Sequence, residues 1–577
     1  MKGFYNVVLH INLSQRSFEE ESIDDNVYRR LLGGKGLGTY LLLNNTKAGV
    51  DPLSADNVII FATGPVTDTK VYGSCRFGAF TKSPLTGIYS ESYAGGKVAE
   101  PLSRTGYDAI IIKGAAEKPV YLEISNKKVI FRDASHLWGK DTFETEDAIK
   151  AEVGRKDAGV IVIGPAGERL VKFALIENDY WRSLGRTGAG AVLGSKKVKG
   201  IAFYGDIRRQ VAKPDAINRM WDELKAISKD DPGTRKFHDE GTLQMVPTLN
   251  KVGAFPTKYW SLGTYDKWPN LTIDALKTKA KVRAHACPKC FMACGNLVQV
   301  TEGKYQGLKI EGPEFETTYA LGGLCMLEHI TEVAYLNDMC DRLGIDTMTF
   351  GNLAAFTIEA SHRKSIGIRL EYGDVDGIAD LLHKVVRREG IGAILAEGIR
   401  YAAKEWGLED LAIHVKGLEP AGYEPRVLKA MGLAFAVADR GGCHLRATAY
   451  KAELSGIIPP EQIEGKAEVV IDFEDRHTLF DSLILCRFFR DLYPWEKIAL
   501  LINAATGMEL DKKGLQKLAL DITNKAREFN LREGMTKADD TLPKRFFEEK
   551  LEDSGKVLPK SEFDKMLADY YKLKGWD

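Results

Sequence analysis

Long apolar runs are the first thing this 577-residue sequence lacks. The longest, such as Val58–Ala62 and Ile498–Ile502, are far shorter than the roughly 20 residues that a helix needs to cross a bilayer. Residues Met1–Leu13 alternate apolar and polar side chains, without the basic start, apolar centre and small-residue cleavage site of a secretion signal. We therefore predict no membrane insertion and no secretion, and we place the protein in the cytoplasm.

The sequence also lacks net charge, a disulfide-rich composition and short repeats. Its 80 basic and 80 acidic residues cancel, so no overall field attracts nucleic acid or an anionic membrane, and we predict no nucleic-acid partner. Eight cysteines are too few for a disulfide scaffold in a chain of this length. The remaining composition, 44% apolar and 28% charged, is typical of a globular protein with a large interior.

Chain length and local sequence texture predict several domains, because a single core stops growing near about 250–300 residues. Helical periodicity begins after Pro214, whereas short β-branched runs separated by turn residues precede it. We predict an α+β fold with a sheet-rich N-terminal domain at 1–206 and two mostly helical domains at 207–416 and 417–577. The runs that predict strands are Val58–Phe61, Ala109–Lys113, Val120–Ile124, Val160–Ile163 and Gly200–Tyr204.

Two helix ends carry acidic residues. Apolar residues at helical spacing predict a helix over Glu332–Leu343, with Gly344 as its left-handed cap. Asp341 then lies in the last turn and Asp346 in the loop that follows. The same reasoning predicts a helix over Thr478–Leu485 that ends at Cys486.

Three thiols are crowded into eight residues, at Cys287, Cys290 and Cys294. This spacing lets one tight loop bring them to a single inorganic centre, either an iron–sulfur cluster or zinc, and both need a fourth ligand. Zinc usually takes a second nearby pair, and His285 is awkwardly placed to supply it. The spacing favours a 4Fe–4S cluster and leaves structural zinc and buried core thiols open. Four cysteines are predicted to be core residues: Cys75, Cys325, Cys340 and Cys443.

Two glycine-rich segments miss the spacing of known phosphate-binding loops. Gly33–Gly38 is not a G-x-G-x-x-G fingerprint, and Gly190–Lys196 departs from a P-loop by one residue. Both are interpreted as close-packing turns, with cofactor contact as the open alternative.

The cysteine loop lies among further blocks that together resemble the aldehyde:ferredoxin oxidoreductases, and the similarity extends over the whole chain. The resemblance implies a tungsten, or in some relatives molybdenum, held by two pyranopterins, with a 4Fe–4S cluster that passes electrons to ferredoxin or a ferredoxin-like subunit. It makes Cys486 the fourth cluster ligand and places the cofactor at the interface of the domains. The blocks are Thr81–Gly87, Gly185–Ser195, Glu311–Glu316, Asp341–Asp346, Arg440–His444, Asp481–Cys486 and Asp539–Phe546.

In the family, Asp341 and Asp481 begin the two segments that grip the pterins, one in each helical domain. In the second segment Ile484 stands where glycine is expected, and a β-branched residue resists a positive φ, so we expect the turn to differ. By default Arg76, Lys82, Arg182 and Arg186 are surface cations. The resemblance assigns these residues to cofactor binding: Arg76, Arg182, Gly185, Asp341, Gly344, Ile345, Asp346, Asp481 and Leu485.

Glu316 and His444 match the positions that flank the metal in the aldehyde-oxidising members. A carboxylate in a dry pocket has a raised pKa and suits the uptake of a proton, so our hypothesis makes Glu316 the base. His444 would hydrogen-bond the metal oxo group or the substrate oxygen and polarise the carbonyl. On the residues alone, each is equally a buried, satisfied polar side chain.

Two departures from the family pattern bear on metals. Tyr335–Asp338 replaces the Glu-x-x-His that binds an iron between subunits in some members, so we expect no bridging iron; a homodimer stays open. Tyr93 stands where the family has an asparagine near the pterin phosphates. This replacement leaves open whether a magnesium ion links the two cofactors.

The resemblance implies oxidation of a small aldehyde to its carboxylic acid. One alternative is a low-potential reductase of the benzoyl-CoA reductase type. Another, of a different class, is a non-catalytic protein whose cysteines hold zinc.

Overall fold

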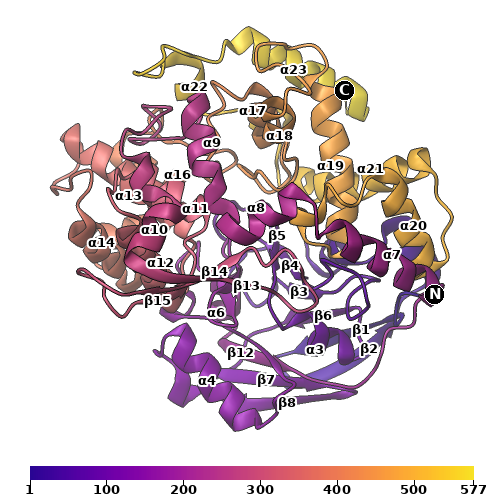
Figure 1. Ribbon diagram of the computed structural model, residues 1–577. Coiled ribbons are helices and arrows are strands. Elements are labelled where there is room, and N and C mark those ends of the chain that lie inside the picture. Colours follow the sequence, from indigo (N-terminus) through magenta and orange to yellow (C-terminus); the bar gives the residue numbers. More distant parts are fainter. Residues whose placement is uncertain (577) are drawn as a thin grey trace.

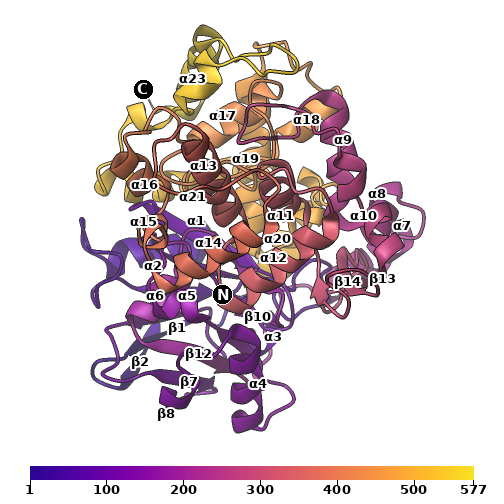
Figure 2. The same cartoon turned by 90° about the vertical axis from the view of Figure 1, so that its left-hand side faces the viewer.

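The computed structural model describes residues 1–576. Figure 1 shows the strands of the N-terminal region gathered at the bottom of the molecule, with helices of the later regions above them. Figure 2, turned by 90°, shows the same two levels. The predicted α+β fold is confirmed, whereas the exact domain limits stay a prediction.

The N-terminal region holds two six-stranded sheets. In the first, the strands lie in the order β2-β1-β6-β3-β4-β5, and in the second in the order β8-β7-β12-β9-β10-β11. The first sheet consists of β1 (Val7–Asn12), β2 (Ser17–Ser22), β3 (Ile59–Ala62), β4 (Phe77–Lys82), β5 (Tyr89–Ala94) and β6 (Ala109–Lys113). The second consists of β7 (Val120–Ser125), β8 (Lys128–Asp133), β9 (Gly159–Val162), β10 (Ile176–Asn178), β11 (Arg182–Leu184) and β12 (Val198–Phe203). Five of these strands confirm the predicted β-branched runs.

The two sheets are copies of one topology. In each, the first and last strands of the copy pair in parallel, and the remaining neighbours are antiparallel. In each copy a 12-residue helix precedes the third strand, α2 (Gly34–Asn45) or α4 (Thr142–Val153), and the first copy has the shorter helix α1 (Asp25–Leu31) before it. A second helix precedes the last strand, α3 (Ala99–Arg104) or α6 (Ala189–Ser195). The N-terminal region is therefore a structural duplication, which the search for shorter repeats did not reveal.

Apolar strand faces explain how the duplicated sheets pack. Ile59, Phe61 and Ile110 of the first sheet share a core with Ile161 and Ile201 of the second. The outer face of the first sheet is covered by α1 (Asp25–Leu31), α2 and part of α21 (Lys512–Arg532). Helix α4 covers the outer face of the second. Within the glycine-rich α2, Gly36 and Gly38 lie against Leu31 and Phe80, which confirms the close-packing interpretation.

The second region is helical except for one small sheet. Its three antiparallel strands are β13 (Ala280–His285), β14 (Gly295–Val300) and β15 (Lys309–Glu311). The helices are α7 (Pro214–Ile227), α8 (Pro232–Glu240), α9 (Met245–Val252), α10 (Ile273–Lys279), α11 (Phe315–Thr317), α12 (Ile330–Leu343), α13 (Thr347–His362), α14 (Val375–Arg387), α15 (Ile391–Leu395) and α16 (Ile399–Trp406).

The third region is helical and shares the largest core of the molecule with α12–α14 of the second. Among residues 1–576, no helix is long and apolar enough to cross a bilayer. The helices are α17 (Lys429–Val437), α18 (Tyr450–Leu454), α19 (Lys466–Leu483), α20 (Trp495–Thr506), α21, α22 (Lys544–Glu548) and α23 (Lys560–Lys574).

Candidate active site

Helix α12 ends as the sequence predicts. Gly344 has φ +78° and caps the helix, and its N–H donates to the carbonyl of Asp341. The N–H of Ile345 donates to the carbonyl of Cys340 at 2.9 Å. Asp346 then caps α13, accepting from the N–H of Met348. The chain thus reverses tightly and exposes the segment from Asp341 to Asp346 toward the second sheet.

Helix α19 differs from the prediction in both its limits. It begins at Lys466, well before Thr478, and it ends at Leu483 instead of reaching Cys486. Ile484 takes φ +59° and ψ +50°, so the expected change in the turn was wrong. A Cβ on Gly34 would lie 2.7 Å from Ile484 Cδ1, so the bare Gly34 makes room for the isoleucine side chain.

Both helix ends rest on equivalent points of the duplicated sheets. Gly164, after β9, approaches the carbonyl of Leu343 so closely that a Cβ would lie 2.4 Å from it. Gly64, after β3, approaches Leu483 in the same way, at 2.2 Å. The N–H of Asp346 donates to Phe173, and the N–H of Cys486 donates to Gly73. The two segments therefore lie in matching positions on the two copies.

The charges around the two aspartates differ. Asp341 accepts from Asn337 Nδ2 at 3.0 Å, and burial raises the pKa of its carboxyl well above the usual range. Asp481 contacts two guanidinium groups, those of Arg446 at 2.6 Å and Arg487. Asp481 thus lies in a network of buried ion pairs, whereas Asp341 forms no ion pair among the residues that the structure describes.

The cysteine loop joins β13 to β14, and its residues Lys289 and Ala293 have positive φ. The ring of Phe291 in the loop lies 5.1 Å from that of Phe489, which follows the end of α19, so the two segments meet. Within residues 1–576, no three His, Cys, Asp or Glu side chains lie close enough to hold one metal ion.

Two arginines lie beside the thiols. Arg76 Nη1 is 3.6 Å from Cys486 Sγ, and Arg76 Nη2 donates to the carbonyl of Tyr93 at 2.9 Å. The pKa of Arg182 is raised, in part by the nearby thiols of Cys287 and Cys294, although burial opposes this. Neither is an ordinary surface cation.

Cys75 is a core residue, as predicted, but it also hydrogen-bonds the thiol of Cys287. The other three predicted core cysteines, Cys325, Cys340 and Cys443, are buried as well.

Arg186 and Lys82 are buried, so the prediction that they are surface cations was wrong. Arg186 is 7% exposed; its Nε donates to Asp346 at 3.1 Å, and its Nη1 donates to the carbonyl of Glu419 at 2.9 Å. It ties the first segment to the third region, immediately after Gly185, which follows β11. Lys82 pairs with Glu533 at 2.6 Å. The glycines that flank Arg186 were the only sequence signal that this segment is buried.

Glu316 lies in the short helix α11 and faces His444. Its Oε1 is 3.4 Å from His444 Nε2, and its Oε2 accepts from the N–H of Gly422 at 3.1 Å. Burial raises the pKa of Glu316 to about 8. Burial and nearby arginines, Arg440 first, lower the pKa of His444 well below its usual value. Near neutral pH the pair is therefore a protonated carboxyl beside a neutral imidazole.

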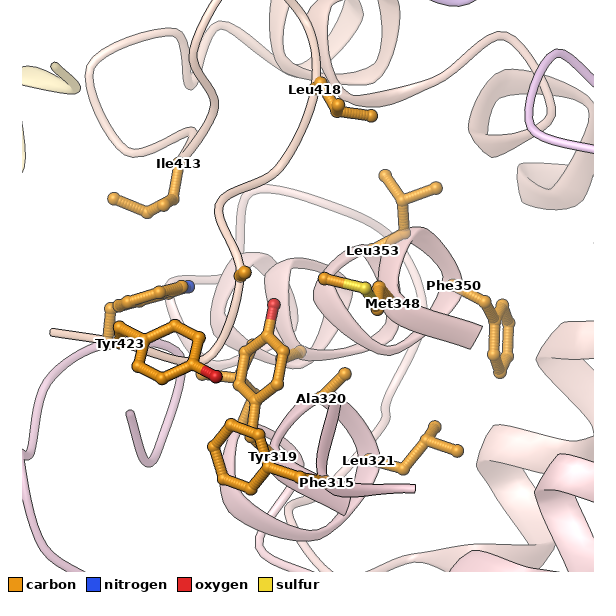
Figure 3. Packing of buried hydrophobic residues seen from close by; sticks show 14 of the residues in the cluster. Phe315, Tyr319, Ala320, Leu321, Met348, Phe350, Leu353, Ile413, Leu418 and Tyr423 are labelled. Atoms are coloured by element: carbon orange, nitrogen blue, oxygen red, sulfur yellow. The ribbon is translucent and has the colours of Figure 1, made fainter. Parts of the chain in front are cut away.

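Aromatic side chains wall this pair. Figure 3 shows Phe315, Tyr319 and Tyr423 packed together at the site. Tyr423 hydrogen-bonds Glu316, and its ring lies 5.6 Å from that of His444 and stacks on Tyr450 at 4.0 Å. Sequence reasoning missed Tyr423, because a lone tyrosine in a loop carries no pattern.

Buried polar atoms without hydrogen-bond partners gather around the two segments and the Glu316–His444 pair. An unpaired buried polar group costs about 1–3 kcal/mol, so such a concentration indicates a polar group bound between them. The atoms belong, among others, to Arg76, Glu177, Asn178, Glu316, Glu419, Arg440, Arg446 and Arg487. A large ligand with ring amines, carbonyls and phosphates fits this mixture of donors and acceptors.

The fold and site define an oxidoreductase, and the comparisons with known proteins agree. Residues 8–205 match the family model of the aldehyde ferredoxin oxidoreductase N-terminal domain, and residues 219–577 match that of domains 2 and 3. The chain belongs to the aldehyde ferredoxin oxidoreductase family, as the sequence blocks predicted.

Relatives cover the whole chain. A tungsten-containing aldehyde ferredoxin oxidoreductase of Pyrococcus furiosus is 36% identical over all of this chain and 97% of the relative. A WOR-like subunit of an aliphatic sulfonate oxidoreductase from the same organism is 27% identical, over 100% of this chain and 95% of that relative. The active-site complex BamBC of benzoyl-coenzyme A reductase superposes with a TM-score of 0.85 at 25% identity, covering 100% of this chain and 95% of that one.

Proposed function

We propose that this protein oxidises an aldehyde to the carboxylic acid at a tungsten bis-pyranopterin centre. The electrons then pass through a 4Fe–4S cluster to ferredoxin or a ferredoxin-like subunit. One aldehyde and one water give one carboxylic acid, two protons and two electrons. The observation that carries the proposal is the buried Glu316–His444 pair, which lies among unpaired polar atoms in a chain 36% identical to a tungsten-containing aldehyde oxidoreductase.

The resemblance assigns the residues that would hold the cofactors, and their positions in the fold support the assignment. Asp341 and Asp481 would accept hydrogen bonds from the pterin rings, and the reversed backbones at Gly344–Asp346 and Ile484–Leu485 would present N–H and carbonyl groups. Arg76 and Arg182 would offset the negative charge of the pterins and of the cluster thiolates, and Gly185, which has no side chain, would let its backbone approach a pterin closely. Cys287, Cys290, Cys294 and Cys486 would bind the cluster. When bound, the tungsten centre supplies the two-electron redox chemistry.

Glu316 and His444 divide the proton chemistry between them. Once ionised, the Glu316 carboxylate accepts a proton in the dry pocket, and the Gly422 N–H holds the other oxygen of the carboxylate in place. Neutral His444 donates a hydrogen bond to the substrate oxygen and polarises the carbonyl. The buried aromatic side chains of Phe315, Tyr319 and Tyr423 would keep water away from the pair.

Metal analysis and turnover test the proposal together. The protein is purified without oxygen, its tungsten, iron and zinc are measured, and viologen reduction is followed with short, branched and aromatic aldehydes. We expect tungsten, about four irons per chain, and aldehyde-dependent dye reduction that yields the acid. Zinc without iron or tungsten would overturn the proposal in favour of a structural protein.

A low-potential reductase is the second candidate, because BamBC of benzoyl-coenzyme A reductase shares the fold over the whole chain. Reduction of an aromatic thioester by the protein, with no oxidation of any aldehyde, would favour it. The greater identity to the aldehyde-oxidising relative favours the first candidate.

A further inference from the structure

We propose that a basic groove beside the cysteine loop is the docking surface for a small acidic iron–sulfur carrier. The inference rests on the proposed function, because it presumes that electrons leave through a cluster on Cys287, Cys290, Cys294 and Cys486. It adds where the carrier binds and which charge the carrier must present.

The groove has a cavity volume of about 540 Å³ and is open to solvent. Segments far apart in the sequence form it: the N-terminus, residues 68–70, the start of α7 with the residues before it, and the cysteine loop. In Figure 1 the N-terminus and α7 lie side by side at the right of the molecule. Each segment contributes at least one cation, and the exposed ones are Lys2, Lys70, Arg208 and Lys289.

Acidic side chains cancel only part of this charge, because Arg208 pairs with Asp68 and Lys289 with Glu100, whereas Lys2 and Lys70 have no acidic partner among the ion pairs of residues 1–576. The one carboxylate that lines the groove, Asp68, is fully buried and lies within 2.9 Å of Arg104 and 2.8 Å of Arg208. The remaining lining cation, Arg209, is buried and paired with Asp108. Lys2 donates to the neutral amide of Gln210. The surface that a partner would meet is therefore net positive.

The groove adjoins the cysteine loop through Lys289. Lys289 stands between Cys287 and Cys290 in the sequence and lines the groove, with its ammonium 2.7 Å from Glu100. Both cysteines are partly exposed. Electron transfer slows steeply with distance, so a carrier seated here, beside the loop that holds three of the four cysteines, would lie near the cluster.

Other hollows fit an acidic carrier less well. The hollow that Cys287 itself lines has a volume of only about 150 Å³, and two carboxylates, Asp179 and Glu311, line it. Two hollows of about 630 Å³ elsewhere are lined by more carboxylates than cations. Position and charge together therefore favour the basic groove.

A carrier that is small and rich in carboxylates around its own cluster matches this surface. Complementary charge raises association rates by about 10- to 1,000-fold at low salt and does little for a neutral dye. The effect of the groove's charge should therefore appear in the Michaelis constant for ferredoxin. It should weaken as added salt screens the surface.

The test compares two electron acceptors on the complete, metal-loaded enzyme. The double variant Lys2→Glu/Lys70→Glu and the single variant Arg208→Gln are assayed with an acidic 2[4Fe–4S] ferredoxin and with benzyl viologen, using one aldehyde that the wild type oxidises. The matched control, Lys384→Glu/Lys404→Glu, makes the same charge change on α14 and α16, on the opposite side in Figure 1.

We expect the double variant to lose at least about tenfold in kcat/KM for ferredoxin at low salt, through KM, with its viologen rate unchanged. Arg208→Gln should lose less, and the control should lose nothing. Unchanged ferredoxin kinetics in both groove variants, with normal viologen rates, would overturn the docking surface and leave the proposed function standing. A wild type that reduces neither acceptor would overturn the proposed function, and the docking surface with it.

Discussion

The ends of α12 and α19 follow the same backbone path on the two copies of the N-terminal sheet. Gly344 and Ile484 both take a left-handed conformation, and each helix end lies against a glycine that follows the third strand of its copy. For a residue with a Cβ this conformation costs about 1–2 kcal/mol. The first end avoids that cost with a glycine in the turn itself. The second accepts it and has its glycine, Gly34, in the neighbouring helix instead.

The electrostatics of the two ends differ more than the backbones do. Asp341 has an amide partner and a raised pKa, whereas Asp481 lies between the guanidinium groups of Arg446 and Arg487. Arg446 also pairs with Glu91, which in turn binds Lys35 at 3.0 Å. The last position of the segment is a helix cap at Asp346 but a thiol at Cys486. Symmetry of the fold is thus combined with different chemistry, and only the second segment ends in a thiol.

The largest effect is expected at the last position of the two segments, where one has Cys486 and the other Asp346. Cys486→Ala should lose most of its iron, because a 4Fe–4S cluster would be left with three thiolates. Asp346→Ala should keep its iron, because that carboxylate only caps α13 and pairs with Arg186. Iron per chain and the electron paramagnetic resonance signal of the reduced protein measure both. Full iron and an unchanged signal in Cys486→Ala would remove this cysteine from the cluster.

Replacing Asp341 and Asp481 by asparagine, one at a time, should show how much the charges around the two residues differ. Asp481→Asn leaves buried guanidinium groups short of a counter-charge and should destabilise the protein by about 3 kcal/mol. Asp341→Asn replaces a carboxyl whose pKa is already raised, so it should cost less than about 1 kcal/mol. Thermal unfolding of the two variants measures the difference. Equal losses would show that the charge networks do not distinguish the two ends.

A smaller effect is expected at Gly34, the glycine that makes room for the side chain of Ile484. A Cβ at Gly34 would lie 2.2 Å from the carbonyl oxygen of Asp481, so Gly34→Ala should destabilise the second end by about 2 kcal/mol through overpacking. Gly49→Ala is the matched control, since Gly49 also has a positive φ but nothing within 4 Å of the added Cβ. Thermal unfolding compares them. A loss no larger than that of the control would mean that Ile484 does not depend on Gly34.

Local pattern predicted the strands, helix α12 and its Gly344 cap, because each depends on residues close in the sequence. The turn at Ile484 was not predictable, since the space for its side chain comes from Gly34, about 450 residues away. Arg186 and Tyr423 were missed for the same reason: their partners Asp346, Glu419 and Glu316 come together only in the fold. The duplication was hidden in the sequence. The two copies share their topology and a Gly-Pro step, at residues 64 and 164, but they share no sequence motif longer than that.

The most direct measurement of the central claim is the pH dependence of aldehyde oxidation in the wild type and in Glu316→Gln. Burial raises the pKa of Glu316 to about 8, so the carboxylate that accepts the proton is scarce at pH 7 and forms as the pH rises. The wild-type rate should therefore increase through about pH 8 and then level off. Glu316→Gln should retain tungsten and iron yet lose turnover at every pH. A fully active Glu316→Gln variant with the wild-type pH profile would contradict the account.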